Sequence, residues 1–227
     1  MRKTNTTMIH YQEYLLHDKE VEKNVLTTIA NKDEITPDNF YQTGYECISF
    51  KKSSVFALEA VLASVVPMDK SVIILNSGAN SSATVETCLK HNINFKVVEF
   101  SDNHIDFTSL EEVLSSSDNF SHICISLTES TSLKDIDLHR LKEITEKSST
   151  GLFLYYSGDI MNLNRIRKYK IDYLVGNLIS SLSSFVLARR NKLVQTEGNA
   201  RSFSKDLHSL WQQTLRNRRR EIEPMCF

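Results

Sequence analysis

The sequence predicts an α/β fold: a three-layer domain with a mainly parallel, seven-stranded sheet, helices on both faces, and one antiparallel strand. Seven short apolar runs alternate with stretches of helical periodicity. The intervening helices are of crossover length, which favours right-handed βαβ units and parallel pairing. The last two runs, 173–177 and 184–189, are joined by too few residues for such a crossover, so they should pair antiparallel.

The individual elements follow from the spacing of apolar residues and from cap and turn residues. We expect strands at 47–50, 72–75, 95–100, 122–127, 152–156, 173–177 and 184–189. We expect helices at 18–30, 54–65, 83–91, 109–115, 138–147, 160–168 and 206–216. Asp106 or Thr108 lies near the expected N-cap of the helix at 109–115.

Length and composition bound the organisation of the chain. With 227 residues, 41% of them hydrophobic, the chain can bury one substantial core. We therefore expect an N-terminal segment with an amphipathic helix (1–45), an α/β domain (46–198), and a C-terminal helix with a basic tail (199–227). The formal net charge of -1 gives no overall attraction to nucleic acid or to an anionic membrane. No apolar run has the length of a membrane span, so we expect no membrane insertion.

The cysteine pattern indicates a reducing compartment. Cys47, Cys88, Cys124 and Cys226 are widely spaced and form no Cys-x-x-Cys pair. This spacing argues against a structural zinc site and against a redox dithiol. The first residues contain no apolar core of signal-peptide length. We expect reduced thiols and a cytoplasmic protein.

Two terminal features have more than one interpretation. Val25, Leu26 and Ile29 recur at helical spacing, so the helix at 18–30 either packs on its own domain or forms a dimer contact. Near the C-terminus, a basic run is followed by acidic residues, which favours a solvated face or a partner's acidic patch over nucleic-acid binding. The run consists of Arg216, Arg218, Arg219 and Arg220.

Six segments resemble one enzyme family in their order and approximate spacing. They are FKKSSVFALEAVLASVVP at 50–67, VIILNSGANSSA at 72–83, HICISLTESTS at 122–132, IDYLV at 171–175, SFVLARRNKL at 184–193 and NARSFSKDLHSLWQ at 199–212. The chain is similar here to the 2-aminoethylphosphonate–pyruvate transaminases, in the class V branch of fold-type-I aminotransferases that use pyridoxal phosphate. The resemblance covers roughly residues 15–215 and implies the large domain of that fold.

The resemblance also implies where a cofactor phosphate would lie, and this segment has changed. The family's Gly-Gly-Ser-Gly-Thr loop stands here as Lys51, Lys52, Ser53, Ser54 and Val55. Glycines at a helix N-terminus let backbone N–H groups approach a phosphate. The loss of three glycines argues against that contact, although Ser53 and the two lysines retain groups able to hold an anion.

Two further segments of the implied pocket differ from the family's sequence, and one of them differs more than the other. The aromatic residue that stacks on the cofactor ring in many relatives corresponds to Asn80, which has no comparable π-face. The family's His-Glu-Thr-Thr-Thr-Gly segment is better kept, with Glu129 and Thr131 at two of its positions. Because Ser and Thr also suit a strand-end turn, this segment alone says little about ligand binding.

The largest departures from the family concern its catalytic chemistry. The aspartate that keeps the pyridine nitrogen protonated corresponds to Tyr155, with Asp159 beyond the strand end. The Schiff-base lysine of the family lies between the last two strands, whereas residues 176–183 here contain no lysine. Lys170 and Lys192 lie at the outer ends of those strands. The family's small domain, with its substrate-binding arginine, is also expected to be missing. We therefore expect no catalytic residue, no bound cofactor and no metal in this chain.

Three hypotheses on function remain. The first is a non-catalytic, aminotransferase-like protein that acts as a homodimer or as a heterodimer with an intact aminotransferase relative, with phosphonate metabolism as the process that the resemblance implies. The second is an enzyme, either a transaminase or a binder of another anionic ligand, that uses an altered pocket at the carboxyl ends of the strands. Its candidate residues are Lys51, Lys52, Ser53, Glu129 and Thr131. The third is a decayed gene product.

Overall fold

The computed structural model describes residues 19–33, 40–76, 79–101, 104–117, 119–127, 136–156, 162–177 and 183–222. Its strands are β1 Tyr45–Phe50, β2 Ser71–Asn76, β3 Asn94–Ser101, β4 His104–Ile105, β5 Phe120–Leu127, β6 Gly151–Tyr156, β7 Tyr173–Asn177 and β8 Ser184–Arg189. Its helices are α2 Lys19–Asp33, α3 Ser54–Val65, α4 Ala79–Lys90, α5 Phe107–Ser115, α6 Leu138–Ser148, α7 Leu163–Lys168, α8 Arg190–Val194 and α9 Leu207–Ile222. Two short 3₁₀ turns, η1 Phe40–Thr43 and η2 Phe203–Lys205, complete the described elements.

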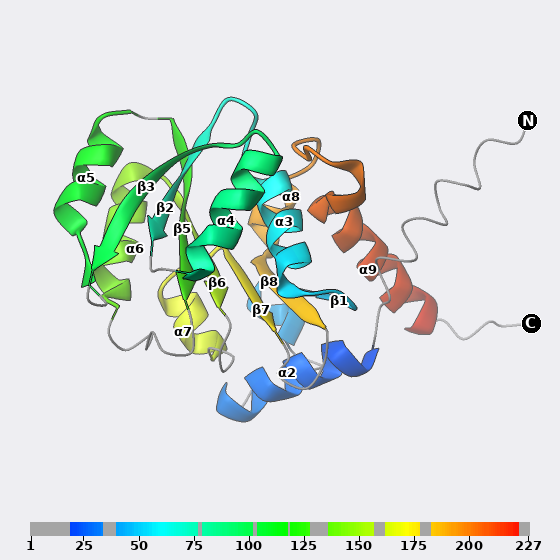
Figure 1. Ribbon diagram of the computed structural model, residues 1–227. Coiled ribbons are helices and arrows are strands. Elements are labelled where there is room, and N and C mark those ends of the chain that lie inside the picture. Colours follow the sequence, from blue (N-terminus) through cyan, green and yellow to red (C-terminus); the bar gives the residue numbers. More distant parts are fainter. Residues whose placement is uncertain are drawn as a thin grey trace, which may run out of the picture.

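The strands form one mixed sheet in the order β1-β8-β7-β6-β5-β2-β3-β4 (Figure 1). The pairs β2·β3, β2·β5, β5·β6 and β6·β7 are parallel. Strand β8 runs antiparallel to both of its neighbours, β1 and β7. The seven expected strands and the one reversed strand are thereby confirmed. The two-residue β4, which the sequence did not predict, adds a short antiparallel pair to the end of β3.

Helices cover both faces of the sheet and enclose one apolar core on each. The core on one face contains side chains of α2, α5, α6 and α7, among them Val25 and Ile29. The core on the other face contains side chains of α3, α4, α8 and α9, among them Leu62 and Trp211. Burying each such large apolar side chain stabilises the fold by about 1.5–3 kcal/mol relative to exposure. Helix α2 thus packs on its own domain, which was one of its two interpretations.

Side-chain caps fix where three helices begin. The backbone N–H of Ser109 donates to the Asp106 carboxylate (3.0 Å), so α5 starts immediately after Asp106. Asp137 and Asn162 accept equivalent bonds at the starts of α6 and α7. Each cap contributes about 1 kcal/mol. The cap at Asn162 explains why α7 begins at residue 163 and not at the expected residue 160.

Two expected boundaries were wrong, one by about one turn and the other by nearly two. Helix α4 begins at Ala79, not at residue 83. The first N–H groups of a helix have no intrahelical partner, so polar residues, whose side chains can hydrogen-bond to the backbone, are compatible with a first turn. Helix α9 continues to Ile222, not 216. Arginine is a good helix former, and Arg218 also has carboxylate partners on α2 and β1, so the helix includes the basic run. Within the described residues, no helix combines the length and apolar composition needed to cross a membrane.

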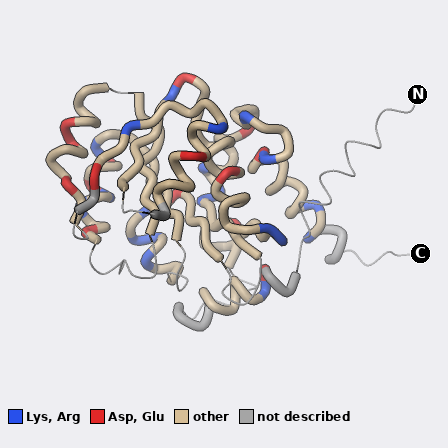
Figure 2. The backbone as a smooth tube through the Cα atoms, in the orientation of Figure 1, with Lys and Arg blue, Asp and Glu red and all other residues tan. Residues whose placement is uncertain are grey.

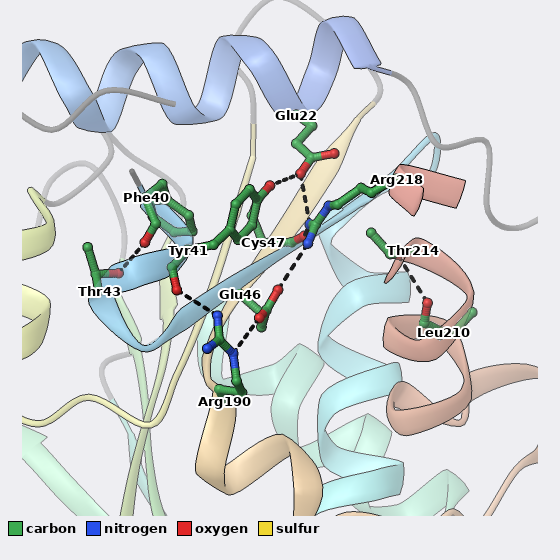
Figure 3. A network of polar contacts seen from close by, with 10 residues as sticks. All are labelled: Glu22, Phe40, Tyr41, Thr43, Glu46, Cys47, Arg190, Leu210, Thr214 and Arg218. Atoms are coloured by element: carbon green, nitrogen blue, oxygen red, sulfur yellow. Dashed lines mark hydrogen bonds and ion pairs between the residues drawn. The ribbon is translucent and has the colours of Figure 1, made fainter. Parts of the chain in front are cut away.

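A buried ionic network fastens the edge strand β1 to helices on both faces (Figure 3). The Arg218 guanidinium, from α9, donates to Glu22 of α2 (2.8 Å) and to Glu46 of β1 (3.0 Å). It also donates to the backbone carbonyl of Cys47 (2.8 Å) and lies 4.1 Å from the centre of the Tyr41 ring. The expectation that the basic run lies on a solvated face or meets a partner's acidic patch was wrong for Arg218, because its carboxylate partners belong to the same chain.

Candidate functional site

The candidate site lies at the carboxyl edge of the sheet. Strands β1, β2, β5, β6 and β7 all end at this edge, and the reversed strand β8 begins there. Open α/β sheets bind ligands outside the carboxyl ends of their parallel strands. The described residues of this edge include Lys51 to Ser54, Tyr155 and Ser184.

The connection from β1 to α3 places four candidate residues side by side. Lys51 and Lys52 are exposed, and Ser54 is buried. Ser53 is the N-cap residue of α3 with an extended backbone, but its side chain makes no capping hydrogen bond. Its carbonyl accepts from the backbone N–H of Phe56 (3.0 Å) and from the Ser184 hydroxyl (3.2 Å). Ser184, which sequence reasoning missed, therefore holds this turn against the start of β8.

The Tyr155 phenol points from β6 to the first turn of α3. Its hydroxyl and that of Ser54 are 2.9 Å apart, and both side chains are buried. A second buried hydroxyl pair joins Thr84 of α4 to Ser126 of β5 (2.8 Å). Hydroxyl groups at this edge thus bond across to neighbouring elements. The sequence held no signal for these pairs, because Ser and Thr at strand and helix ends are equally typical of turns.

Tyr155→Phe is expected to lower the free energy of unfolding by about 1 kcal/mol, since it removes one hydrogen bond and leaves the Ser54 hydroxyl buried without its partner. Chemical denaturation of Tyr155→Phe, Ser54→Ala and the double variant measures the coupling between the two groups. The double variant should lose less than the sum of the single losses. Strict additivity would show that the two hydroxyls do not interact.

Several residues of the pocket that the sequence implied are not described by the structure. Glu129 and Thr131 lie outside the described residues, as does Asp159. Asn80 lies in the first turn of α4, and its side chain is not among those described. The structure therefore brings together Ser53, Ser54 and Tyr155.

The connection between β7 and β8 is short. Asn177 and Ser184 are directly opposite each other in the antiparallel register, so residues 178–183 make the whole connection. Those residues include no lysine. Lys170 precedes β7 and Lys192 lies in α8 beyond β8, so both belong to the opposite, amino edge of the sheet, as expected from the sequence.

The amino edge holds a buried pair of titratable groups. His122 of β5 and Asp172, just before β7, are both buried, and both lie against Gly151. Burial lowers the pKa of His122 to about 3, and the nearby Lys192 charge acts in the same direction. Burial raises the pKa of Asp172, although Lys192 and Arg189 oppose the shift. The Arg189 guanidinium donates to Asp172 at 2.9 Å.

Comparison with solved structures shows the same architecture in two aminotransferases. The ureidoglycine–glyoxylate aminotransferase of Bacillus subtilis matches 94% of this chain and 64% of its own, with a TM-score of 0.57 and 11% identity. The pyridoxamine–pyruvate aminotransferase of Mesorhizobium loti matches 94% of this chain and 62% of its own, with a TM-score of 0.55 and 12% identity. The chain has the fold of the fold-type-I pyridoxal-phosphate transferases.

The sequence of this transferase-like chain resembles curated 2-aminoethylphosphonate–pyruvate transaminases. The one from Bacillus cytotoxicus is 26% identical over 222 residues, which cover 91% of this chain and 60% of the relative. A second, from Burkholderia lata, is 23% identical over 174 residues, or 74% of this chain and 46% of the relative. No family model matches the sequence. The chain thus spans about half to three-fifths of the length of these two relatives.

Proposed function

We propose that this chain is a non-catalytic, aminotransferase-like protein that acts by association, either with a second copy or with an intact aminotransferase relative. The observation that carries the proposal is the connection between β7 and β8, where residues 178–183 offer no amine. Transamination needs a lysine there to hold the cofactor and to move a proton. Lys170 and Lys192 are at the other edge of the sheet, too distant in the topology to replace it.

The Tyr155 position supports the same proposal. A carboxylate at this strand end would stabilise a protonated pyridine nitrogen when pyridoxal phosphate is bound. A phenol hydroxyl carries no such charge, and that of Tyr155 is engaged by Ser54. The described residues therefore do not fit the cofactor's ring, and we assign this chain no step of cofactor chemistry. Involvement in phosphonate metabolism and a cytoplasmic location remain parts of the proposal, based on the names of the relatives and on the cysteine pattern.

The test of the non-catalytic role is cofactor binding by the purified protein. We expect no stoichiometric aldimine absorbance with added pyridoxal phosphate, and no lysine adduct by mass spectrometry after borohydride reduction. The B. cytotoxicus transaminase, treated in parallel, is the positive control. A stoichiometric adduct on one lysine would contradict the proposal.

Association is tested separately. Light scattering during size-exclusion chromatography should give the mass of a dimer, or co-purification from the native source should recover an aminotransferase relative. Recovery as a monomer alone in both experiments would contradict this part of the proposal.

The alternative, anion binding at the carboxyl edge, has one specific observation in its favour. Lys51 and Lys52 are exposed beside Ser53, whose side chain is not used as a helix cap. A phosphate or phosphonate series should then raise the melting temperature, and Lys52→Gln should reduce the shift. An unchanged melting temperature across the series would count against this alternative.

A further inference from the structure

A basic pocket lies at the amino edge of the sheet, away from the candidate site. It has a volume of about 590 Å³ and is formed by the turn before β1, the end of α7, and the junction of β8 with α8. Of its nine lining residues, four are basic and none is acidic. The basic residues are Arg167, Lys170, Arg189 and Arg190.

Internal contacts hold two of these guanidinium groups in place. Arg189 donates through Nη1 to the buried carboxylate of Asp172 (2.9 Å). Arg190 donates through Nε to the buried Glu46 (2.7 Å) and through Nη2 to the backbone carbonyl of Tyr41 (2.6 Å), as Figure 3 shows. Each contact uses only part of the guanidinium, which carries further N–H donors. A donor group fixed before binding loses little conformational entropy when a ligand arrives.

The other two basic residues add positive charge that the chain neutralises only weakly. Lys170 pairs with Glu146 at 2.5 Å, but both side chains are about half exposed, and such surface pairs are weak. Arg167 is exposed, and no carboxylate among the described residues lies within ion-pair distance of it. Arg165 and Lys168 lie on the same short helix and make its surroundings more positive. Figure 2 marks the basic positions along the backbone in blue.

We propose that this pocket binds a small anion with two or more negative charges, of the phosphorylated or polycarboxylate class. Guanidinium groups match the geometry of phosphate and carboxylate oxygens, and bonds between charged partners are stronger than neutral ones. The lining also includes Tyr45 and the exposed Val194, and apolar groups of this kind suit a ligand with a carbon framework. The site is independent of the carboxyl edge, so it stands whether or not the chain binds a cofactor.

The experiment is isothermal titration of the full chain with inorganic pyrophosphate and, separately, with citrate. Arg167→Gln removes one exposed pocket charge and should weaken binding about tenfold, while leaving the unfolding transition unchanged. Lys168→Gln removes the same charge from the same helix outside the pocket lining, and binding should stay within about twofold of the wild type. Lys52→Gln tests the competing anion site at the opposite edge of the sheet.

Binding of pyrophosphate alone or of citrate alone would support the site and identify the phosphorylated or the polycarboxylate source. Binding of both would support the shared anion chemistry. The proposal would be overturned by the absence of binding for both anions, or by equal losses in Arg167→Gln and Lys168→Gln, which would indicate general charge attraction. Loss of binding in Lys52→Gln would assign the anion to the carboxyl edge instead. Lys170→Gln, on the pocket wall, should also weaken binding and is a second, independent test of the site.

Discussion

Replacing Arg218 with alanine is expected to lower the free energy of unfolding by about 3–5 kcal/mol. The side chains of Glu22 and Glu46 are almost fully buried, and Arg218 is a partner of both. Without the guanidinium, Glu22 loses the ion pair with Arg218 but keeps its hydrogen bond from Tyr41, and among the described residues Glu46 keeps its ion pair with Arg190. Removing one partner of a buried ion pair lowers the stability strongly, because the charge that remains is buried and cannot be hydrated. Urea unfolding monitored by circular dichroism measures the loss.

Arg216→Ala is the matched control for this prediction. Arg216 lies on the same helix and is exposed, so its removal changes helix propensity and net charge by the same amount. We expect a change of no more than about 0.5 kcal/mol. If Arg218→Ala unfolded at the same urea concentration as Arg216→Ala, the three-element network would not contribute to stability, and α9 would not be fastened to β1 by this residue.

Acidification from pH 7 to pH 5 is expected to cost the wild type about 2 kcal/mol through His122 alone. The imidazole is buried, its Nδ1 atom has no hydrogen-bond partner among the described residues, and its pKa is lowered to about 3. In the unfolded chain, histidine titrates near its ordinary pKa of about 6.5. Below that pH the unfolded state binds a proton that the folded state does not, so stability falls progressively toward pH 3.

Other charged groups face His122, and the experiment must separate them. Asp172 and Lys192 lie nearby, and the Tyr173 ring is 5.7 Å away. The raised pKa of Asp172 acts in the opposite sense, because its folded carboxyl group gains a proton more readily than the unfolded one. Stability should therefore be compared between the wild type and His122→Leu at each pH. The wild type should lose about 2 kcal/mol more than the variant between pH 7 and pH 5.

His139→Gln serves as the control for the pH profile, since the side chain of His139 is 69% exposed. The free energy of unfolding of this variant should change with pH as that of the wild type does. A His122→Leu profile parallel to that of the wild type would mean that His122 titrates near its ordinary pKa when the protein is folded.

The fold could be read from the sequence because its strongest determinant, the alternation of apolar runs with helical periods, is local. The expected boundaries of 173–177 and 184–189 match β7 and β8, since each strand is a short buried run that ends in a polar residue, Asn177 or Arg189. Helix ends were less predictable where a tertiary partner decides them. Helix α9 carries Arg218 to Glu22 and Glu46, whose positions no local pattern reveals.

The residues of the candidate site could be predicted only by matching them to the pocket positions of the family that the sequence resembles. The resemblance indicated that Ser54 and Tyr155 face one pocket, but not that their hydroxyls bond to each other. The basic pocket could not be foreseen, because Arg167 and Arg190 come from segments that only the sheet topology brings together. The net charge of a near-neutral sequence does not show which of its charged residues will lie together in the folded protein.

The contact between Arg218 and the carbonyl of Cys47 also limits how two copies of this protein can meet. An edge strand normally presents unpaired backbone groups to which a strand of another molecule can add, a common route to aggregation. At β1, Arg218 occupies the Cys47 carbonyl, and the ion pair with Glu46 holds the guanidinium over the strand. At the other side of the sheet, β3 carries Lys96 and Glu99, charges that disfavour edge pairing. We therefore expect two copies of this chain to associate through their helical faces and not by pairing the edge strands of their sheets.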